Sequence, residues 1–153
     1  MAFDGIVTKS IVSELQNLIG SKIDKIYEPD RNTIIIGLYL QGKNYALNIC
    51  IDAHNCRLNL TTHSRVNPLV APNFCMLLRK YLISSKIKNI YSFDLDRIIC
   101  IDFEGNNELK DTLNFHLIIE LMGRRSNIIL LNDKNFIIDS LKHIITSDRE
   151  ILP

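Results

Sequence analysis

The stretch Leu113–Leu121 reads LNFHLIIEL, and apolar side chains return at every second position along it. Alternation of this kind places the apolar residues on one face of a β-strand. The same alternation, or a run of β-branched and apolar residues, occurs at 33–40, 45–51 and 99–103. One-sided strands of this type are typical of antiparallel sheets that cover a core with one face.

Shorter apolar segments and turn residues extend this pattern. Short strands are expected at 58–60, 128–131 and 136–138, and turns at 41–44, 105–107, 132–135 and around Gly123. The hairpins near 33–51 and 97–121 have a similar layout, which hints at a duplicated unit.

Two segments have the spacing of amphipathic helices. In the first, apolar residues at 7, 11, 15, 18 and 19 share a face, Asp4 or Thr8 can cap the start, and Gly20 can end it. In the second, which follows Pro72, apolar residues at 74, 77, 78, 81 and 82 share a face. Hairpins interrupted by two helices predict an α+β fold with antiparallel, β-sandwich-like sheets and flanking helices.

Length and composition indicate a single globular domain. The chain has 153 residues, of which 46% are hydrophobic, and a net charge of +1. A charge this close to zero does not indicate nucleic-acid binding, so an RNA-binding hypothesis depends on local clusters of arginine. The N-terminus lacks the pattern of a signal peptide, and the apolar runs are too short to cross a bilayer. We therefore expect a cytoplasmic protein with no membrane partner.

The histidines and cysteines do not form a recognisable metal pattern. His54 and Cys56, with Cys50 nearby, supply only part of a zinc ligand set. Cys50 and Cys100 lie in apolar segments, as does Cys75, and we expect reduced, buried thiols. His116 lies on the polar face of its strand and is expected to be a half-exposed structural histidine.

Motifs typical of catalysis are absent from the sequence. It has no nucleophile elbow, no glycine-rich phosphate loop and no pair of carboxylates with a histidine beside them. We therefore expect a protein that binds a partner, with no catalytic residue, cofactor or metal ion.

Asp96 and Arg97 form the first candidate binding motif, at the entry to an apolar strand. The guanidinium group can grip a phosphate or a base edge with two hydrogen bonds, and the carboxylate can accept one from an exocyclic amine. The alternative is a surface ion pair at a strand entry, contributing about 0–1 kcal/mol. Spacing alone favours the ion pair.

The segment Gly123–Arg124–Arg125–Ser126–Asn127 is the second candidate, directly after a hydrophobic strand. The glycine permits a turn with positive φ, whose backbone N–H groups can form an anion-binding nest. Two arginines and a hydroxyl around such a nest suit an RNA phosphate. A plain β-turn with solvated arginines is an equally good interpretation.

The stretches around these motifs resemble one family over nearly the whole chain. They are MAFDG at 1–5, NP at 67–68 with PNFCMLLRK at 72–80, LDRI at 95–98, FEGNNEL at 103–109 and ELMGRRSNIIL at 120–130. Together they resemble the N-terminal domain of NFACT proteins, whose bacterial members include RqcH and proteins named fibronectin-binding protein A. On this resemblance, residues 1–153 are that domain, and helical, coiled-coil and RNA-binding regions are expected downstream.

The resemblance implies a function in ribosome quality control. Family members bind large ribosomal subunits obstructed by peptidyl-tRNA and recruit tRNA, alanyl-tRNA in bacteria, to add a C-terminal tail without mRNA. Family residues for tRNA recruitment correspond to Asp4, Asp96 and Arg97 here. The usual family motif has histidine at the position of Arg125, and this departure adds positive charge.

Two alternatives also come from the resemblance. The family's older name implies an adhesin that binds fibronectin, although the sequence has no export signal. The family domain is also similar in fold to the N-terminal domain of formamidopyrimidine-DNA glycosylases, which attack the sugar with a proline after the initiator methionine. This chain has Ala2 there, so a glycosylase-like domain would lack catalytic activity.

Overall fold

The computed structural model describes residues 5–62, 65–92, 97–106 and 109–143. Within these residues the helices are α1 (Gly5–Leu15), α2 (Asn73–Leu82) and the short 3₁₀ helices η1 (Gln16–Leu18) and η2 (Gly123–Arg125). The strands are β1 (Lys22–Asp30), β2 (Thr33–Leu40), β3 (Lys43–Asp52), β4 (Asn55–Leu60), β5 (Lys86–Ser92), β6 (Ile98–Asn106), β7 (Thr112–Glu120), β8 (Asn127–Leu131) and β9 (Ile137–Ser140).

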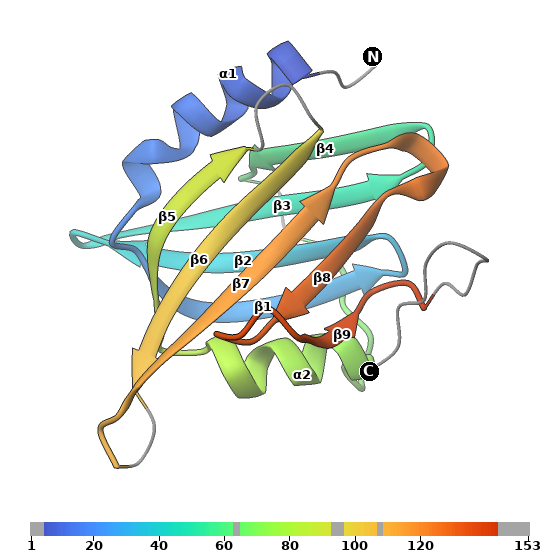
Figure 1. The fold of residues 1–153 in the computed structure, drawn as a ribbon. Coiled ribbons are helices and arrows are strands. Elements are labelled where there is room, and N and C mark those ends of the chain that lie inside the picture. Colours follow the sequence, from blue (N-terminus) through green and yellow to red (C-terminus); the bar gives the residue numbers. More distant parts are fainter. Residues whose placement is uncertain (1–4, 63–64, 93–96, 107–108, 144–153) are drawn as a thin grey trace.

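The strands form one antiparallel sheet in the order β4-β3-β2-β1-β5-β6-β7-β8-β9. The strands β5–β9 cross in front of β1–β4, so the sheet folds into two facing layers (Figure 1). Helix α1 packs on β5 and β6, and α2 packs on β1 and β9, at opposite edges of the sandwich. The antiparallel α+β architecture expected from the sequence is therefore confirmed.

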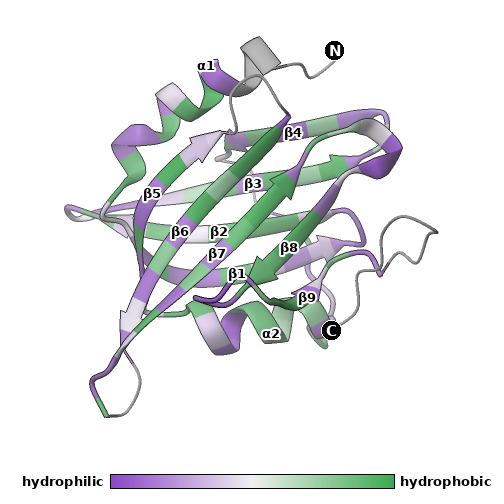
Figure 2. Ribbon diagram, in the orientation of Figure 1, coloured by the Kyte–Doolittle hydropathy of each residue, from purple (hydrophilic) through white to green (hydrophobic). Residues whose placement is uncertain are grey.

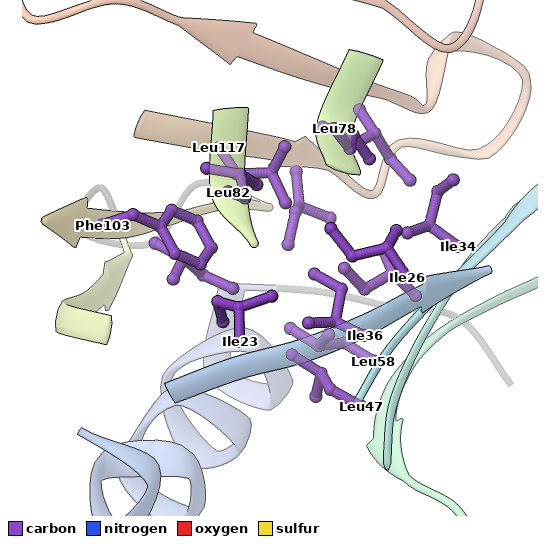
Figure 3. Packing of buried hydrophobic residues seen from close by; sticks show 14 of the residues in the cluster. Ile23, Ile26, Ile34, Ile36, Leu47, Leu58, Leu78, Leu82, Phe103 and Leu117 are labelled. Atoms are coloured by element: carbon purple, nitrogen blue, oxygen red, sulfur yellow. The ribbon is translucent and has the colours of Figure 1, made fainter. Parts of the chain in front are cut away.

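Apolar side chains from both layers fill the space between them. Ile26 and Ile36 of the first layer lie near Phe103 and Leu117 of the second, with Leu82 of α2 beside them (Figure 3). Hydrophobic residues follow the strands, whereas hydrophilic ones gather at many of the turns (Figure 2). No helix within the described ranges has the length and hydrophobicity needed to cross a membrane.

Two strands were missed by the sequence patterns, and both carry a β-bulge at the same place. In β1 the register shifts between Ile23 and Lys25, and in β5 it shifts between Ile87 and Asn89. A bulge inserts one extra residue, so inward-facing side chains become three residues apart and the alternation is lost. The patterns at 33–40 and 45–51, in contrast, correspond to β2 and β3.

These bulged strands belong to an internal repeat. Residues 18–27 read LIGSKIDKIY and residues 82–91 read LISSKIKNIY, identical except at the third, seventh and eighth positions. The third position has a positive φ in both copies, +95° at Gly20 and +72° at Ser84. Each copy joins the end of a helix to a bulged strand, so the chain contains two similar helix–strand units.

The two copies also bond to each other reciprocally at the centre of the sheet. The Ile23 N–H donates to the Ser85 carbonyl at 2.8 Å, and the Ile87 N–H donates to the Ser21 carbonyl at 2.9 Å. This exchange of hydrogen bonds joins β1 to β5. It lies between two similar three-stranded units, β1–β3 and β5–β7. The duplication hinted at by the two hairpins is therefore present, and it includes the strand before each hairpin.

Candidate nucleic-acid interface

The structure brings the two candidate motifs to the same end of the β6–β7 hairpin. Arg97 directly precedes β6, and its carbonyl accepts a hydrogen bond of 2.9 Å from the Leu121 N–H. The next residue pair in this ladder is Ile98 with Glu120. The segment that contains Arg124 therefore begins beside Arg97, although the two arginines are far apart in sequence.

Arg97 is exposed, so its side chain is accessible at this end of the hairpin. Burial of Arg97 in the core would have excluded a contact with RNA. Asp96 and Asp4 lie outside the described residues, and their assignment to tRNA binding stays a prediction.

The Gly123 turn has the positive φ that the sequence indicated, at +61°. It forms the short helix η2, in which the Arg125 N–H donates to the Met122 carbonyl and the Ser126 N–H donates to the Gly123 carbonyl, both at 3.1 Å. These two amides are committed to the turn itself. An anion-binding nest at this turn therefore cannot use these two amides, whereas the exposed arginine side chains can still reach a phosphate.

Ser126 is fully buried and braces this turn. Its hydroxyl accepts a hydrogen bond of 2.8 Å from the Met122 N–H and lies 3.2 Å from the Cys56 Sγ. The contact with Cys56 joins the turn to β4 in the other layer. The structure does not support a contact between the Ser126 hydroxyl and a phosphate, because this hydroxyl points into the protein.

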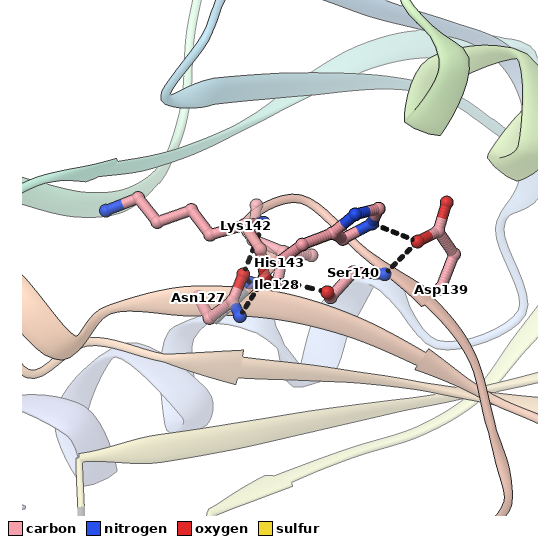
Figure 4. Close-up of polar contacts among 6 residues, drawn as sticks. All are labelled: Asn127, Ile128, Asp139, Ser140, Lys142 and His143. Atoms are coloured by element: carbon pink, nitrogen blue, oxygen red, sulfur yellow. Dashed lines mark hydrogen bonds and ion pairs between the residues drawn. The ribbon is translucent and has the colours of Figure 1, made fainter. Parts of the chain in front are cut away.

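Asn127 is also buried, and its side chain joins β8 to the segment after β9 (Figure 4). Its Nδ2 donates to the Lys142 carbonyl at 3.0 Å, while its Oδ1 accepts from the N–H groups of Lys142 and Ile128, each at 2.9 Å. All three bonds are internal. The candidate phosphate contact of Asn127 is therefore replaced by a structural role.

Replacing Asn127 by alanine is expected to lower the free energy of unfolding by about 1–3 kcal/mol, because buried backbone groups lose their partners. Chemical denaturation followed by circular dichroism measures this decrease. The exposed Asn44 supplies the control, and Asn44→Ala should change stability by less than about 0.5 kcal/mol. If Asn127→Ala unfolds like wild type but no longer binds RNA, the structural role is contradicted and Asn127 contacts the RNA instead.

Arg124 and Arg125 are both exposed on this turn. The turn lies against the end of β3, where a Cβ on Gly123 would be 4.0 Å from the Ala53 carbonyl oxygen. With Arg97, they make three exposed arginines near the same end of the β6–β7 hairpin. Such a group of arginines suits the phosphates of a nucleic acid, despite the near-neutral charge of the chain.

Among the other basic residues that could have extended this surface, Arg57 lies close to the Gly123 turn, because its neighbour Cys56 contacts Ser126. Arg65 forms an ion pair of 2.7 Å with Asp30, and Arg79 donates to the Ile26 carbonyl at 2.8 Å. Lys80 lies over the ring of Tyr81, and Arg57 is exposed on β4. Burial alone would raise the pKa of Asp30, but hydrogen bonds from the Asn32 N–H and the Arg65 side chain hold it below its ordinary value.

The partial zinc pattern around His54 is not assembled. Cys56 donates to the Asp52 carbonyl at 3.1 Å and contacts Ser126, whereas Cys50 is buried in β3 opposite Arg57. His54 is exposed on the turn between the strands. All four cysteines are free, as expected.

Comparison with known proteins decides the family. A family model for the NFACT N-terminal and middle domains matches residues 4–153. The chain belongs to the NFACT family. It is 37% identical over 158 residues to a protein named Rqc2 homolog RqcH from Bacillus subtilis, covering 100% of this chain and 28% of that protein. The chain thus spans less than a third of the length of this relative.

Solved structures of NFACT relatives have the same fold. The N-terminal domain of the fibronectin-binding protein PavA from Streptococcus pneumoniae superimposes with a TM-score of 0.94 at 32% identity, covering 99% of this chain and 59% of that one. The N-terminal part of the fibronectin/fibrinogen-binding protein FBPS from Streptococcus suis gives a TM-score of 0.95 at 34% identity, with the same coverage. The chain therefore shares the fold of these two domains over nearly its whole length.

Proposed function

We propose that this chain is the tRNA- and large-subunit-binding domain of a ribosome quality-control factor. In this role it helps to recruit alanyl-tRNA to obstructed large subunits that retain peptidyl-tRNA, where a C-terminal tail is added to the stalled chain without mRNA. The observation that carries the proposal is the backbone bond between Leu121 and Arg97, which brings the start of the segment with the exposed Arg124 and Arg125 beside the exposed Arg97. The relatives named Rqc2 homologs support the ribosomal context.

The arrangement is suited to binding and contributes no reaction step. Three exposed arginines, one directly before β6 and two on η2, can offer charge-assisted hydrogen bonds to phosphates, which position an RNA without reading its sequence. Identity of the tRNA would then come from additional contacts made by the rest of the protein. Several weak sites on one chain reinforce each other through effective concentration.

Sequencing the RNA that co-purifies with the complete protein tests this proposal. Enrichment of tRNA together with large-subunit RNA is the expected result, with tRNA for alanine the main species. Preparations with Arg97, Arg124 and Arg125 all replaced by alanine should lose the tRNA fraction. Equal tRNA recovery from wild type and this variant would contradict the proposal.

A second candidate function is binding of fibronectin, and the structural neighbours favour it through their names. Surface labelling of intact cells separates it from the first. A ribosome-associated factor is expected to escape labelling and to sediment with large subunits. Labelling of the native protein together with binding to immobilised fibronectin would support the adhesin.

The relation to DNA glycosylases concerns the fold and predicts no chemistry. We propose that the similarity to the N-terminal domain of formamidopyrimidine-DNA glycosylases is limited to the sandwich. Because position 2 is alanine, the chain has no secondary amine to attack an abasic sugar. Borohydride treatment with abasic DNA should therefore trap no covalent product, and a trapped product would show that another amine performs this step.

A further inference from the structure

The outer face of β5, β6 and β7 carries a compact group of polar side chains. The facing residues form two rows across the three strands: Asn89, Asp102 and His116 in one row, and Tyr91, Cys100 and Ile118 in the other. The residues that alternate with them, Ile101 and Leu117, belong to the core. The group therefore lies on the side of the sheet away from the core.

Within this group a thiol, a carboxylate and an imidazole converge. The His116 Nδ1 lies 2.6 Å from the Asp102 Oδ1, and the Cys100 thiol donates to the same oxygen at 3.3 Å. One ligand atom from each of the three residues lies within 4.8 Å of the other two. The side chains of Asp102 and His116 are 18% and 23% exposed, and Cys100 is buried.

The other half of the internal repeat has different residues at the positions of this group. Aligning the two halves by their strand pairings gives the positions in the first half that correspond to Cys100, Asp102 and His116; they are Ile35, Gly37 and Ala46. Those three residues help to line an open hollow on the outer face of β1–β3. The same three-stranded arrangement thus occurs once without any titratable side chain at these positions and once with three.

We propose that Cys100, Asp102 and His116 bind a zinc ion on the outer face of the second layer. Zinc accepts sulfur, nitrogen and oxygen ligands together, whereas calcium and magnesium prefer oxygen alone. Zinc–ligand bonds of about 2.0–2.3 Å place the ligand atoms of a tetrahedral site roughly 3–4 Å apart. The thiol and carboxylate already have this separation, whereas the imidazole nitrogen, at 2.6 Å from the carboxylate, must move away from it to reach a tetrahedral position.

Three protein ligands leave the fourth position for water or for a group from a partner. Binding exchanges the thiol proton for the metal and releases that proton to solvent. The ion would link the side chains of β6 to that of β7, two strands that also meet at the Arg97–Leu121 end of the hairpin.

The alternative is a cross-strand hydrogen bond with a cysteine beside it, and the chain contains a natural control for it. His143 lies 2.6 Å from Asp139, the same separation as in the pair His116–Asp102, but no cysteine accompanies it among the described residues. A thiol control is also available, since Cys56 is half-buried and bonds to Asp52 and Ser126.

Titration of the 153-residue chain with Co²⁺, a spectroscopic substitute for zinc, tests the proposal. We expect one equivalent to bind with a near-ultraviolet thiolate-to-cobalt absorption, and Zn²⁺ to displace it and raise Tm. Cys100→Ser should abolish the absorption, and Asp102→Asn and His116→Gln should each weaken binding at least tenfold. Cys56→Ser and His143→Gln should bind as wild type does.

The result that would overturn the proposal is wild-type protein with no thiolate absorption in Co²⁺. Binding that survives Cys100→Ser and His116→Gln but is abolished in Cys56→Ser would overturn it too. Circular dichroism of each variant shows whether it is folded. If Cys100→Ser does not fold, the cobalt absorption of the wild-type protein and the weaker binding expected of the isosteric Asp102→Asn variant test the proposal. Every readout is independent of RNA, so the outcome is separate from that of the proposed function.

Discussion

Replacing Arg97 by alanine in the complete protein is expected to weaken its association with tRNA at least about tenfold, equivalent to about 1.4 kcal/mol. A hydrogen bond between a charged donor and a phosphate contributes roughly 1.5–3 kcal/mol, so one guanidinium accounts for an effect of this size. Filter binding or fluorescence anisotropy with labelled tRNA measures the change. The double variant Asp96→Ala with Arg97→Ala should abolish association.

Lys43 is the control for this experiment, because it is exposed at the start of β3, whereas the Gly123 turn lies against the other end of that strand. Lys43→Ala should leave the affinity within about twofold, and both variants should melt like wild type, since exposed side chains contribute little to stability. The salt dependence gives a second readout. Removing one arginine that neutralises a phosphate should reduce the slope of log affinity against log salt by about 0.7–0.9.

Two outcomes would contradict the role of Arg97. One is unchanged tRNA recovery with an unchanged salt slope. The other is an equal decrease in affinity for Arg97→Ala and Lys43→Ala, which would indicate a diffuse effect of charge and no localised binding site. Arg97→Lys adds detail, because it keeps the charge and removes the planar pair of donors.

Much of the fold could be predicted because most strands keep an unbroken period of two. β2 and β7 match the expected segments closely, β2 as a run of β-branched and apolar residues and β7 as a regular alternation. β6 is longer than the expected 99–103, because Gly105 and Asn106, which were expected to form a turn, still pair with β7. β1 and β5 could not be found in this way, because their bulges place the inward-facing isoleucines three residues apart. The signal that would have located them is the repeat of 18–27 at 82–91.

Less of the candidate site could be predicted, because its geometry depends on strand register. The sequence shows that Arg97 and Arg124 are near strand ends, but only the pairing of β6 with β7 places those ends together. Whether Ser126 and Asn127 point outward or inward depends on how η2 turns the chain, and both point inward. His116 was correctly placed opposite the apolar face, whereas its partner Asp102 required the register.

The largest expected effect on stability concerns the centre of the repeat. Ile23 and Ile87 are each 1% exposed and occupy corresponding positions in the two bulged strands. Replacing either by alanine should lower the free energy of unfolding by about 2–5 kcal/mol, because the substitution removes buried methylene groups and leaves a cavity. Urea denaturation followed by circular dichroism measures both decreases on the same chain.

Ile19 and Ile83 are the controls, since they belong to the same repeat but are 36% and 38% exposed. Alanine at either position should cost less than about 1 kcal/mol, because little buried surface is removed. The decreases at Ile23 and Ile87 should also agree within about 1 kcal/mol if the two copies have equivalent packing. If the free energy of unfolding falls strongly for one of these variants and little for the other, the two copies share a sequence pattern but contribute unequally to stability.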